Sequence, residues 1–134
     1  MNLQFQIVVK SSRIDGKGAF ANKPIPARRK IGELNGKIIS VRKGRSLAKQ
    51  NKRVALVELD DKFALYAGET PGVMRYINHS CSPNTYMRVF KHHVEFYTLR
   101  AIKKGEELLC NYGETHHDRQ LPCSCGAPNC RGFL

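Results

Sequence analysis

The chain has 134 residues, which is enough for one domain with its own core and too few for two domains of ordinary size. Hydrophobic residues make up 41% and charged residues 25%, as in a soluble globular protein, and no apolar run approaches the ~20 residues of a membrane span. The first ten residues lack the charged start and apolar middle of a secretory signal peptide. We therefore expect an intracellular protein that is not secreted, whose five cysteines do not form a disulfide set.

The net charge of +12 is concentrated in the first half of the chain. Residues 1–60 carry fourteen Lys or Arg against four Asp or Glu, whereas residues 61–134 carry nine against seven. The densest patch, Arg42 to Arg53, has six cations in twelve residues and no acid. It suits a solvated surface helix and a docking surface for an acidic partner equally well. No aromatic residue interrupts it, so stacking on bases is not indicated.

The first half of the chain predicts short strands separated by turns. Residues 5–10, FQIVVK, form a short apolar run rich in β-formers. Residues 18–43 mix short apolar pieces with Gly and Pro, a pattern typical of strands and turns. Residues 53–68 predict two strands joined by a turn at Asp60-Asp61.

The second half continues this pattern until the tail. Residues 84–102 predict another strand pair around Lys91 to His93. Only residues 45–52 and, more weakly, 116–120 indicate helix, and both stretches are short. Many short strands with frequent turns predict a small, mostly β domain.

Three cysteines near the end of the chain predict a metal site. Cys123, Cys125 and Cys130 follow a C-x-C-x4-C spacing, with Gly and Pro between them to allow sharp turns. A structural zinc ion takes four ligands, commonly thiolates, so the tail alone is one ligand short. Free thiols in a frayed terminus are the other interpretation. The candidates for the missing ligand are Cys81, Cys110, His116 and His117.

Four segments resemble the SET-domain protein lysine methyltransferases. RYINHSCSPN, residues 75–84, is similar to the family's R-F-I-N-H-S-C-x-P-N signature. GEELLCNYG, residues 105–113, resembles G-E-E-L-x-x-x-Y-G, and SRIDGKGAFA, residues 12–21, resembles the opening S-x-x-x-G-x-G-x-F-A turn. PCSCGAPNCRG, residues 122–132, is similar to the cysteine-rich post-SET tail. Because the segments occur in the family's order, the chain is identified as a member of that family.

The resemblance implies a SET-domain fold of small curved β-sheets over residues 5–115, followed by a zinc-binding post-SET tail at 119–134. A knot-like C-terminal crossing would bring the segments of Asn78 and Tyr112 together, which is an exception to the rule against threaded connections. The resemblance also implies S-adenosylmethionine as methyl donor and a protein lysine as acceptor.

The resemblance further implies a role for particular residues. Tyr112 matches the family's catalytic tyrosine, although a tyrosine at a strand end is more often a packing residue. Cys81 joins the three tail cysteines around one Zn²⁺, which leaves Cys110 outside the metal site. The cofactor-binding residues implied by the match are Gly16, Lys17, Gly18, Arg75, Asn78, His79, Tyr112 and Phe133.

Structural roles remain open for several of these residues. Asn78 also suits a turn and His79 a buried hydrogen bond, while Arg75 also suits an internal ion pair. The glycines of residues 16–18 suit a simple hairpin turn as well as close approach to the cofactor. Phe133 suits a hydrophobic plug as well as a cover for the adenine.

The chain departs from the family pattern at the substrate channel. Family members commonly carry Phe or Tyr two residues before the catalytic tyrosine, where this chain has Cys110. The smaller side chain leaves more room, so we expect dimethyl- or trimethyl-lysine to form. The family's D-A-x-x-x-G-N segment is missing here, and Tyr66 falls near its expected acidic position, where it would line the channel.

Three hypotheses follow from these observations. The first is an S-adenosylmethionine-dependent protein-lysine methyltransferase. The second is an inactive, zinc-stabilised SET-fold module that binds acidic partners through Arg42 to Arg53. The third, a nucleic-acid-binding protein, depends on the net charge alone.

The resemblance makes a histone, histone-like or ribosome-associated protein the expected substrate. The basic patch indicates an assembly that contains nucleic acid, and no membrane partner is expected. The corresponding location is the cytoplasm or nucleoid in a prokaryote, and the nucleus or chromatin in a eukaryote or a virus-infected cell. The sequence leaves open the target lysine, the source organism and the oligomeric state, a homodimer included.

Overall fold

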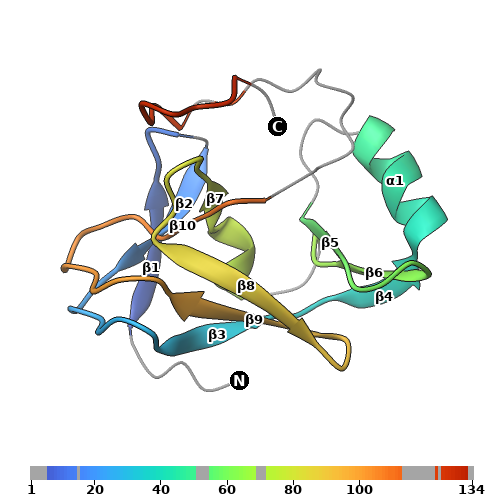
Figure 1. Cartoon of the computed structure of the whole chain (residues 1–134), viewed down its shortest axis with the longest axis horizontal. Coiled ribbons are helices and arrows are strands. Elements are labelled where there is room, and N and C mark those ends of the chain that lie inside the picture. The colour runs from blue at the N-terminus through green and yellow to red at the C-terminus, as the bar shows by residue number, and fades with distance from the viewer. Residues whose placement is uncertain are drawn as a thin grey trace.

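A computed structural model describes residues 6–14, 16–50, 55–68, 72–112, 123 and 125–132. Short strands dominate these residues, which confirms the expected mostly β domain (Figure 1). Within the described residues no helix is long and apolar enough to cross a membrane. The elements in chain order are β1 (Ile7–Ser11), β2 (Lys17–Ala21), β3 (Lys30–Leu34), β4 (Lys37–Ser40), α1 (Val41–Gln50), β5 (Leu56–Glu58), β6 (Phe63–Tyr66), η1 (Met74–Tyr76, a 3-10 turn), β7 (Asn78–His79), β8 (Thr85–Phe90), β9 (His93–Thr98) and β10 (Leu109–Cys110).

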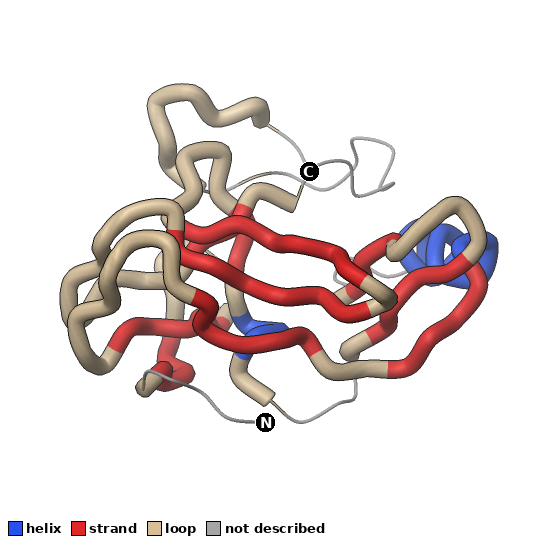
Figure 2. The backbone as a smooth tube through the Cα atoms, turned by 60° about the horizontal axis from the view of Figure 1, so that its bottom comes forward, coloured by secondary structure: helices blue, strands red, loops and turns tan. Residues whose placement is uncertain are grey.

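The strands form three small sheets. β1 and β2 make an antiparallel pair, β4, β6 and β5 a three-stranded sheet in that order, and the largest sheet has the order β3-β9-β8-β10-β7. The helix α1 lies beside the three-stranded sheet, at the opposite end of the molecule from β1 and β2 (Figures 1 and 2). The small separate sheets agree with the SET-domain fold that the sequence predicts.

The short strand β10 is inserted between two strands that are close neighbours in the sequence. It runs parallel to β7, with Leu109 opposite Asn78, and parallel to β8, with Cys110 opposite Thr85. Because β7 and β8 are joined only by residues 80–84, this connection wraps around β10. The insertion brings the segments of the two long motifs together, as the knot-like crossing predicts.

Asn84 fastens the connection to the inserted strand. Its side-chain amide donates to the Glu107 carbonyl at 2.8 Å, and its side-chain oxygen accepts the Leu109 N–H at 2.8 Å. The Asn84 N–H also donates to the Leu109 carbonyl at 3.1 Å, and Ser80 N–H to the Cys110 carbonyl at 3.0 Å. The side chain of Asn84 is 3% exposed, so water does not replace these bonds.

The core lies between β2, β3, β9 and the segment before β10. In β9 the residues Val94, Phe96 and Thr98 are buried while the intervening side chains face outward, which is the alternation of a strand with one buried face. An isolated bridge joins Ile25 to Ile102, and both isoleucines are buried. The domain therefore closes through contacts between its two halves.

Both predicted hairpins are present. At the turn before Phe63 the Asp60 carboxylate accepts the N–H groups of Lys62 and Phe63 at 2.8 and 2.7 Å, which satisfies the turn backbone. The β8–β9 turn places Lys91 and His92 at φ values of 48° and 64°, as a tight type I′ hairpin requires. The strand pairs lie inside the ranges that the sequence predicts.

The helix begins earlier than predicted. We expected residues 45–52, and α1 starts at Val41 because the Ser40 hydroxyl accepts the Lys43 N–H at 3.1 Å and caps the first turn. Gly44 is buried on the sheet side, where an added Cβ would lie 3.1 Å from the Leu56 side chain. The weaker helix expected at residues 116–120 lies outside the described residues.

Replacing Asn84 by Ala should destabilise the crossing. The substitution leaves the Glu107 carbonyl and the Leu109 N–H buried without their partner, so we expect the free energy of unfolding to fall by about 2–4 kcal/mol. Urea denaturation followed by circular dichroism measures it. Ser40→Ala, which removes an exposed helix cap, should cost about 1 kcal/mol. An Asn84 variant no less stable than the Ser40 variant would contradict the role given to Asn84.

Candidate active site and metal centre

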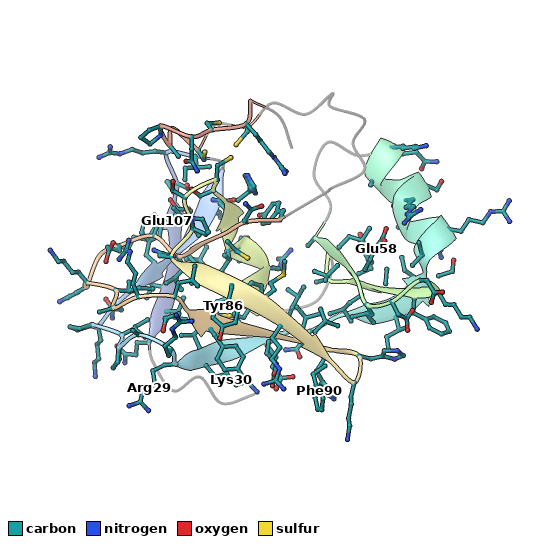
Figure 3. All side chains as sticks on the ribbon, viewed as in Figure 1. Arg29, Lys30, Glu58, Tyr86, Phe90 and Glu107 are labelled. Atoms are coloured by element: carbon teal, nitrogen blue, oxygen red, sulfur yellow. The ribbon has the colours of Figure 1, made fainter. Side chains whose placement is uncertain are left out.

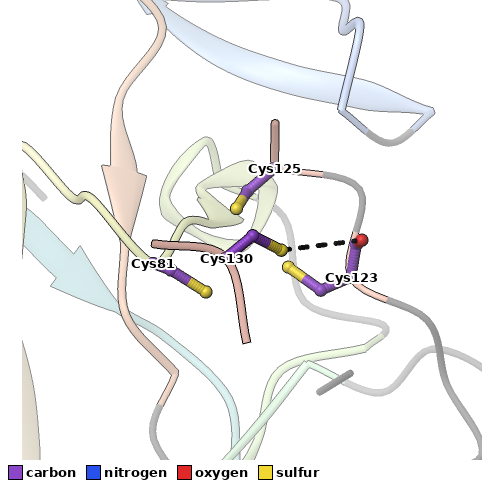
Figure 4. Close-up of side chains that lie close together, drawn as sticks. All are labelled: Cys81, Cys123, Cys125 and Cys130. Carbon is purple, nitrogen blue, oxygen red and sulfur yellow. Dashed lines mark hydrogen bonds between the residues drawn. The ribbon is translucent and has the colours of Figure 1, made fainter. Parts of the chain in front are cut away.

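Four cysteines converge at one point between the β7–β8 connection and the tail. The sulfur atoms of Cys81, Cys123, Cys125 and Cys130 all lie within 4.8 Å of one another (Figure 4). Four thiolates bound to one zinc ion at ~2.3 Å would lie about 3.8 Å apart. The cluster is therefore the right size and the right donor set for a structural zinc ion. Cys110 lies outside the cluster, as predicted.

Hydrogen bonds position the tail against Cys81. The Arg131 N–H donates to the Cys81 sulfur at 3.3 Å, and the Asn129 side-chain amide donates to the Cys81 carbonyl at 3.0 Å. The Ser82 hydroxyl donates to the other side of the Asn129 amide at 2.7 Å. The tail is thus docked by polar contacts in addition to the four thiols.

The close packing of the thiols shifts the pKa values of Cys123 and Cys125. Burial opposes ionisation of Cys125, but hydrogen bonds from backbone groups and from the thiols of Cys123 and Cys130 lower its pKa to about 6. Burial and the neighbouring Cys125 thiolate raise the pKa of Cys123 to about 12. The pKa values of these two neighbouring thiols are therefore shifted in opposite directions, and a bound metal ion would stabilise both as thiolates.

Tyr112 lies directly after β10 and beside β7. Its hydroxyl donates to the Ile77 carbonyl at 2.7 Å, and its N–H donates to the Nδ1 atom of His79 at 3.0 Å. The rings of Tyr112 and His79 are tilted against each other with their centroids 5.1 Å apart. The tyrosine is 37% exposed, so part of its side chain reaches the surface. Burial lowers the pKa of His79 to about 4.

Asn78 is held by a carboxylate that the sequence analysis did not single out. Its side-chain amide donates to the Glu107 carboxylate at 2.9 Å and to the Lys17 carbonyl at 3.1 Å. The Ser12 hydroxyl donates to the same carboxylate at 2.8 Å. Glu107, labelled in Figure 3, thus contacts both Gly18 of β2 and Asn78 of β7. Glu107 is the second glutamate of the GEEL segment, and this is its only signal in the sequence. Its partners Ser12 and Asn78 lie far away along the chain, so the sequence does not indicate the contacts.

The glycine turn before β2 lies next to Asn78. Gly16 has a φ of 46°, its carbonyl accepts the Ser12 N–H at 2.8 Å, and the Lys17 carbonyl accepts the Asn78 amide. Gly18 packs against the Glu107 carboxylate so closely that a Cβ would overlap it. The structure therefore brings the predicted residues 16–18 and Asn78 together. Phe133 lies outside the described residues.

Arg75 is bound by neutral oxygens. Its guanidinium donates to the Gly68 carbonyl at 3.0 Å and to the Tyr76 hydroxyl at 2.6 Å, and it lies 4.5 Å from the centre of the Tyr76 ring. Among the described residues it has no ion pair, and its Nε–H is buried without a partner. Tyr66, which the sequence analysis places in the substrate channel, has its hydroxyl against Gly68.

Cys110 is buried at the end of β10, with 1% of its surface exposed. Burial raises the pKa of its thiol to about 11, against smaller opposing hydrogen bonds from Thr85 and the Met87 backbone. The side chain is therefore a neutral thiol buried in the core, two residues before Tyr112. Its small volume is the feature that distinguishes this position from the Phe or Tyr of the family pattern.

The fold and the thiol cluster define a small β protein in which the strand that precedes Tyr112 is inserted beside a cluster of four cysteines. The family model described as "SET domain" matches residues 16–113. The chain belongs to the SET domain family.

Three curated relatives of the chain are all named as histone-lysine N-methyltransferases. The chain is 32% identical over 131 residues to "Histone-lysine N-methyltransferase trithorax" of Drosophila virilis, covering 92% of this chain and 3% of the relative. It is 34% identical over 135 residues to "Histone-lysine N-methyltransferase, H3 lysine-4 specific" of Eremothecium gossypii (92% and 14%). It is 34% identical over 137 residues to "Histone-lysine N-methyltransferase ATXR7" of Arabidopsis thaliana (96% and 9%). The chain thus spans a small fraction of each relative's length.

Substitution of single cysteines should distinguish the zinc ligands from Cys110, which lies outside the cluster. Because each of the four clustered thiols supplies one ligand, we expect Cys81→Ser and Cys125→Ser to weaken zinc binding by at least about tenfold. Cys110→Ser, a matched change of a cysteine outside the cluster, should retain wild-type zinc affinity. Zinc content after dialysis and competition with a chromogenic chelator measure both. Full zinc affinity in the Cys81 variant would exclude Cys81 as a ligand.

Proposed function

We propose that the chain is an S-adenosylmethionine-dependent protein-lysine N-methyltransferase with one structural Zn²⁺. The observation that carries this proposal is the position of Tyr112, whose hydroxyl and N–H are both bound by the β7 segment of the SET signature. The family match and the relatives' names support the same activity. The zinc ion would hold the tail through Cys81, Cys123, Cys125 and Cys130.

Methyl transfer to an amine requires orientation and a neutral nucleophile. When bound, S-adenosylmethionine supplies an electrophilic methyl group on a sulfonium. The bound donor would supply its methyl group to the lone pair of the neutral amine, with the thioether as leaving group, while Tyr112 orients the amine. A free lysine has a pKa near ~10.4, so the amine must first lose its proton to solvent, which desolvation in a narrow channel favours. Cys110 and Tyr66 are the residues we propose for that channel.

Tyr112 would act as the orienting group. The Tyr112 hydroxyl donates its proton to the Ile77 carbonyl, so its oxygen would act as the acceptor for the amine N–H and for weak C–H contacts from the polarised methyl group. Alignment of the two reacting atoms supplies a large part of the rate in such a displacement. The role therefore depends on where the hydroxyl is held and does not require Tyr112 to ionise.

The donor would bind on the β2 side of Asn78. The glycine turn of residues 16–18 exposes backbone there, and its contact with Asn78 supports a common site. Arg75 has a buried Nε–H without a partner among the described residues, which leaves a donor for the ligand. We also propose His79, Tyr112 and Phe133 as cofactor contacts, in keeping with the family pattern.

The relatives are named for histone lysines, so we propose a histone or histone-like protein as the substrate class and chromatin or a nucleoid as the location. A ribosome-associated protein is the second substrate class to test. The exposed cations of α1 support a polyanionic setting. Arg42, Lys43 and Lys49 are exposed, while Arg45 is paired with Glu58 at 2.8 Å.

The activity can be tested with the zinc-loaded chain, labelled S-adenosylmethionine and histone or whole-cell extract proteins. We expect labelled lysines, and a fall of about 100-fold in kcat for Tyr112→Phe, which loses the hydroxyl but keeps the ring. Calorimetry should show the same cofactor affinity in both proteins within about threefold. Absence of cofactor binding by the wild-type chain would favour the inactive module that binds acidic partners.

The size of residue 110 should control how many methyl groups are added. We expect the wild-type enzyme to form dimethyl- or trimethyl-lysine and Cys110→Tyr to stop at monomethyl-lysine, because the larger ring fills the space beside Tyr112. Mass spectrometry of a peptide product measures the distribution. Cys110→Ser controls for loss of the thiol, and the melting temperature controls for overpacking. A wild-type enzyme that makes only monomethyl-lysine would overturn the prediction.

The cations of α1 should matter for assemblies and not for isolated peptides. Reversing Arg42, Lys43 and Lys49 to Glu should weaken binding to nucleosomes or DNA and reduce its dependence on salt, since fewer counterions are released. Activity on a free peptide should stay unchanged. Electrophoretic mobility shifts at several salt concentrations measure the slope. An unchanged slope would leave α1 as a solvated surface helix.

A further inference from the structure

The imidazole of His79 lies between the metal centre and Tyr112. The residue is 3% exposed and sits at the end of β7. Its Nδ1 atom is 3.0 Å from the Tyr112 nitrogen, and its Nε2 atom is 3.4 Å from the Cys81 sulfur. One ring therefore contacts both a proposed zinc ligand and the proposed catalytic residue.

The two contacts fix the direction of both hydrogen bonds. The Tyr112 N–H can only donate, so Nδ1 must accept and carries no proton. A neutral imidazole then has its proton on Nε2, which makes the Cys81 sulfur the acceptor. The same sulfur also accepts the Arg131 N–H at 3.3 Å. Two hydrogen-bond donors around one sulfur fix the orientation of that sulfur relative to the other three thiols.

We propose that His79 is a positioning residue that links the metal centre to Tyr112. Its Nε2–H orients the Cys81 sulfur, and its Nδ1 fixes the backbone from which the Tyr112 hydroxyl reaches the Ile77 carbonyl. The proposal depends on the proposed function for the meaning of Tyr112 but not for the contacts themselves. It gives the His79 side chain a task apart from the cofactor, which the main chain of β7 remains free to contact.

Two amide variants separate the two arms of this link. The Asn side-chain oxygen in His79→Asn falls near the Nδ1 position and can still accept the Tyr112 N–H, but the side chain is too short to reach Cys81. The Gln amide nitrogen in His79→Gln falls near the Nε2 position and can still donate to the sulfur, but no acceptor remains for Tyr112. His79→Leu removes both arms.

Zinc affinity tests the cysteine arm. Hydrogen bonds to metal ligands are typically worth about 10–100-fold in metal affinity. We expect His79→Asn and His79→Leu to lose at least about tenfold in competition with a chromogenic chelator, and His79→Gln to stay within about threefold of wild type. His93→Leu is the matched control, because that histidine lies on the exposed face of β9 and contacts Glu33. Wild-type zinc affinity in the Asn variant would overturn the cysteine arm.

Hydrogen exchange of the Tyr112 amide tests the other arm without any measurement of activity. In the zinc-loaded proteins, exchange should be at least about tenfold faster in His79→Gln and His79→Leu, and close to wild type in His79→Asn. Equal protection in all variants would overturn the tyrosine arm.

Turnover completes the test. The Gln variant should lose kcat by about tenfold while its KM changes little, since Tyr112 shifts but the cofactor surface stays. If the wild-type enzyme shows no methyl transfer, the proposed function fails, and zinc affinity and exchange still decide the link. If His79→Leu does not fold, the Asn and Gln variants give the answer, because each keeps one of the two hydrogen bonds.

Discussion

The insertion of β10 between β7 and β8 is the constraint on which the rest of the molecule depends. Asn78 and His79 belong to β7, Tyr112 follows β10, and Cys81 lies in the connection that wraps around it. The contact between His79 and Tyr112 depends on this insertion, because the two residues lie 33 positions apart in the chain. The hydrogen bonds of Asn84 hold the connection against β10, the strand that leads to Tyr112.

The two halves of the site are supported in different ways. On the side of the glycine turn, the Glu107 carboxylate gathers Ser12 and Asn78 by hydrogen bonds. On the other side, four thiols and the contacts of Asn129 and Arg131 join the tail to the β7–β8 connection. Tyr112 contacts the β7 segment through the Ile77 carbonyl and through His79, which in turn contacts Cys81. The side of the glycine turn and the side of the tail are thus held by separate sets of contacts, and both sets include residues of β7 or of the connection that follows it.

Local patterns in the sequence were sufficient for much of the fold. The two hairpins follow from alternating apolar residues on either side of polar turns, and the spacing of the tail cysteines predicts a metal site one ligand short. The resemblance supplied Cys81 as the fourth ligand, and the convergence of the sulfur atoms agrees with it. The features that the sequence did not predict depend on contacts between residues far apart in the chain. Ser12 and Glu107 are 95 positions apart, and the start of α1 depends on a serine cap outside the apolar pattern. The partners of Arg75 and the direction of the His79 ring likewise appear only when the strands are assembled.

The wrapped connection also has a consequence for how the molecule folds. Residues 80–84 can close only around a strand that is already in place, so the parallel pairs of β10 are long-range contacts that form against a large loss of chain entropy. Until that step, the hairpins can exist while the tyrosine, the histidine and the four thiols are scattered. A chain that opens at β10 would therefore separate Tyr112 from His79 and Asn84 from its partners in the same event.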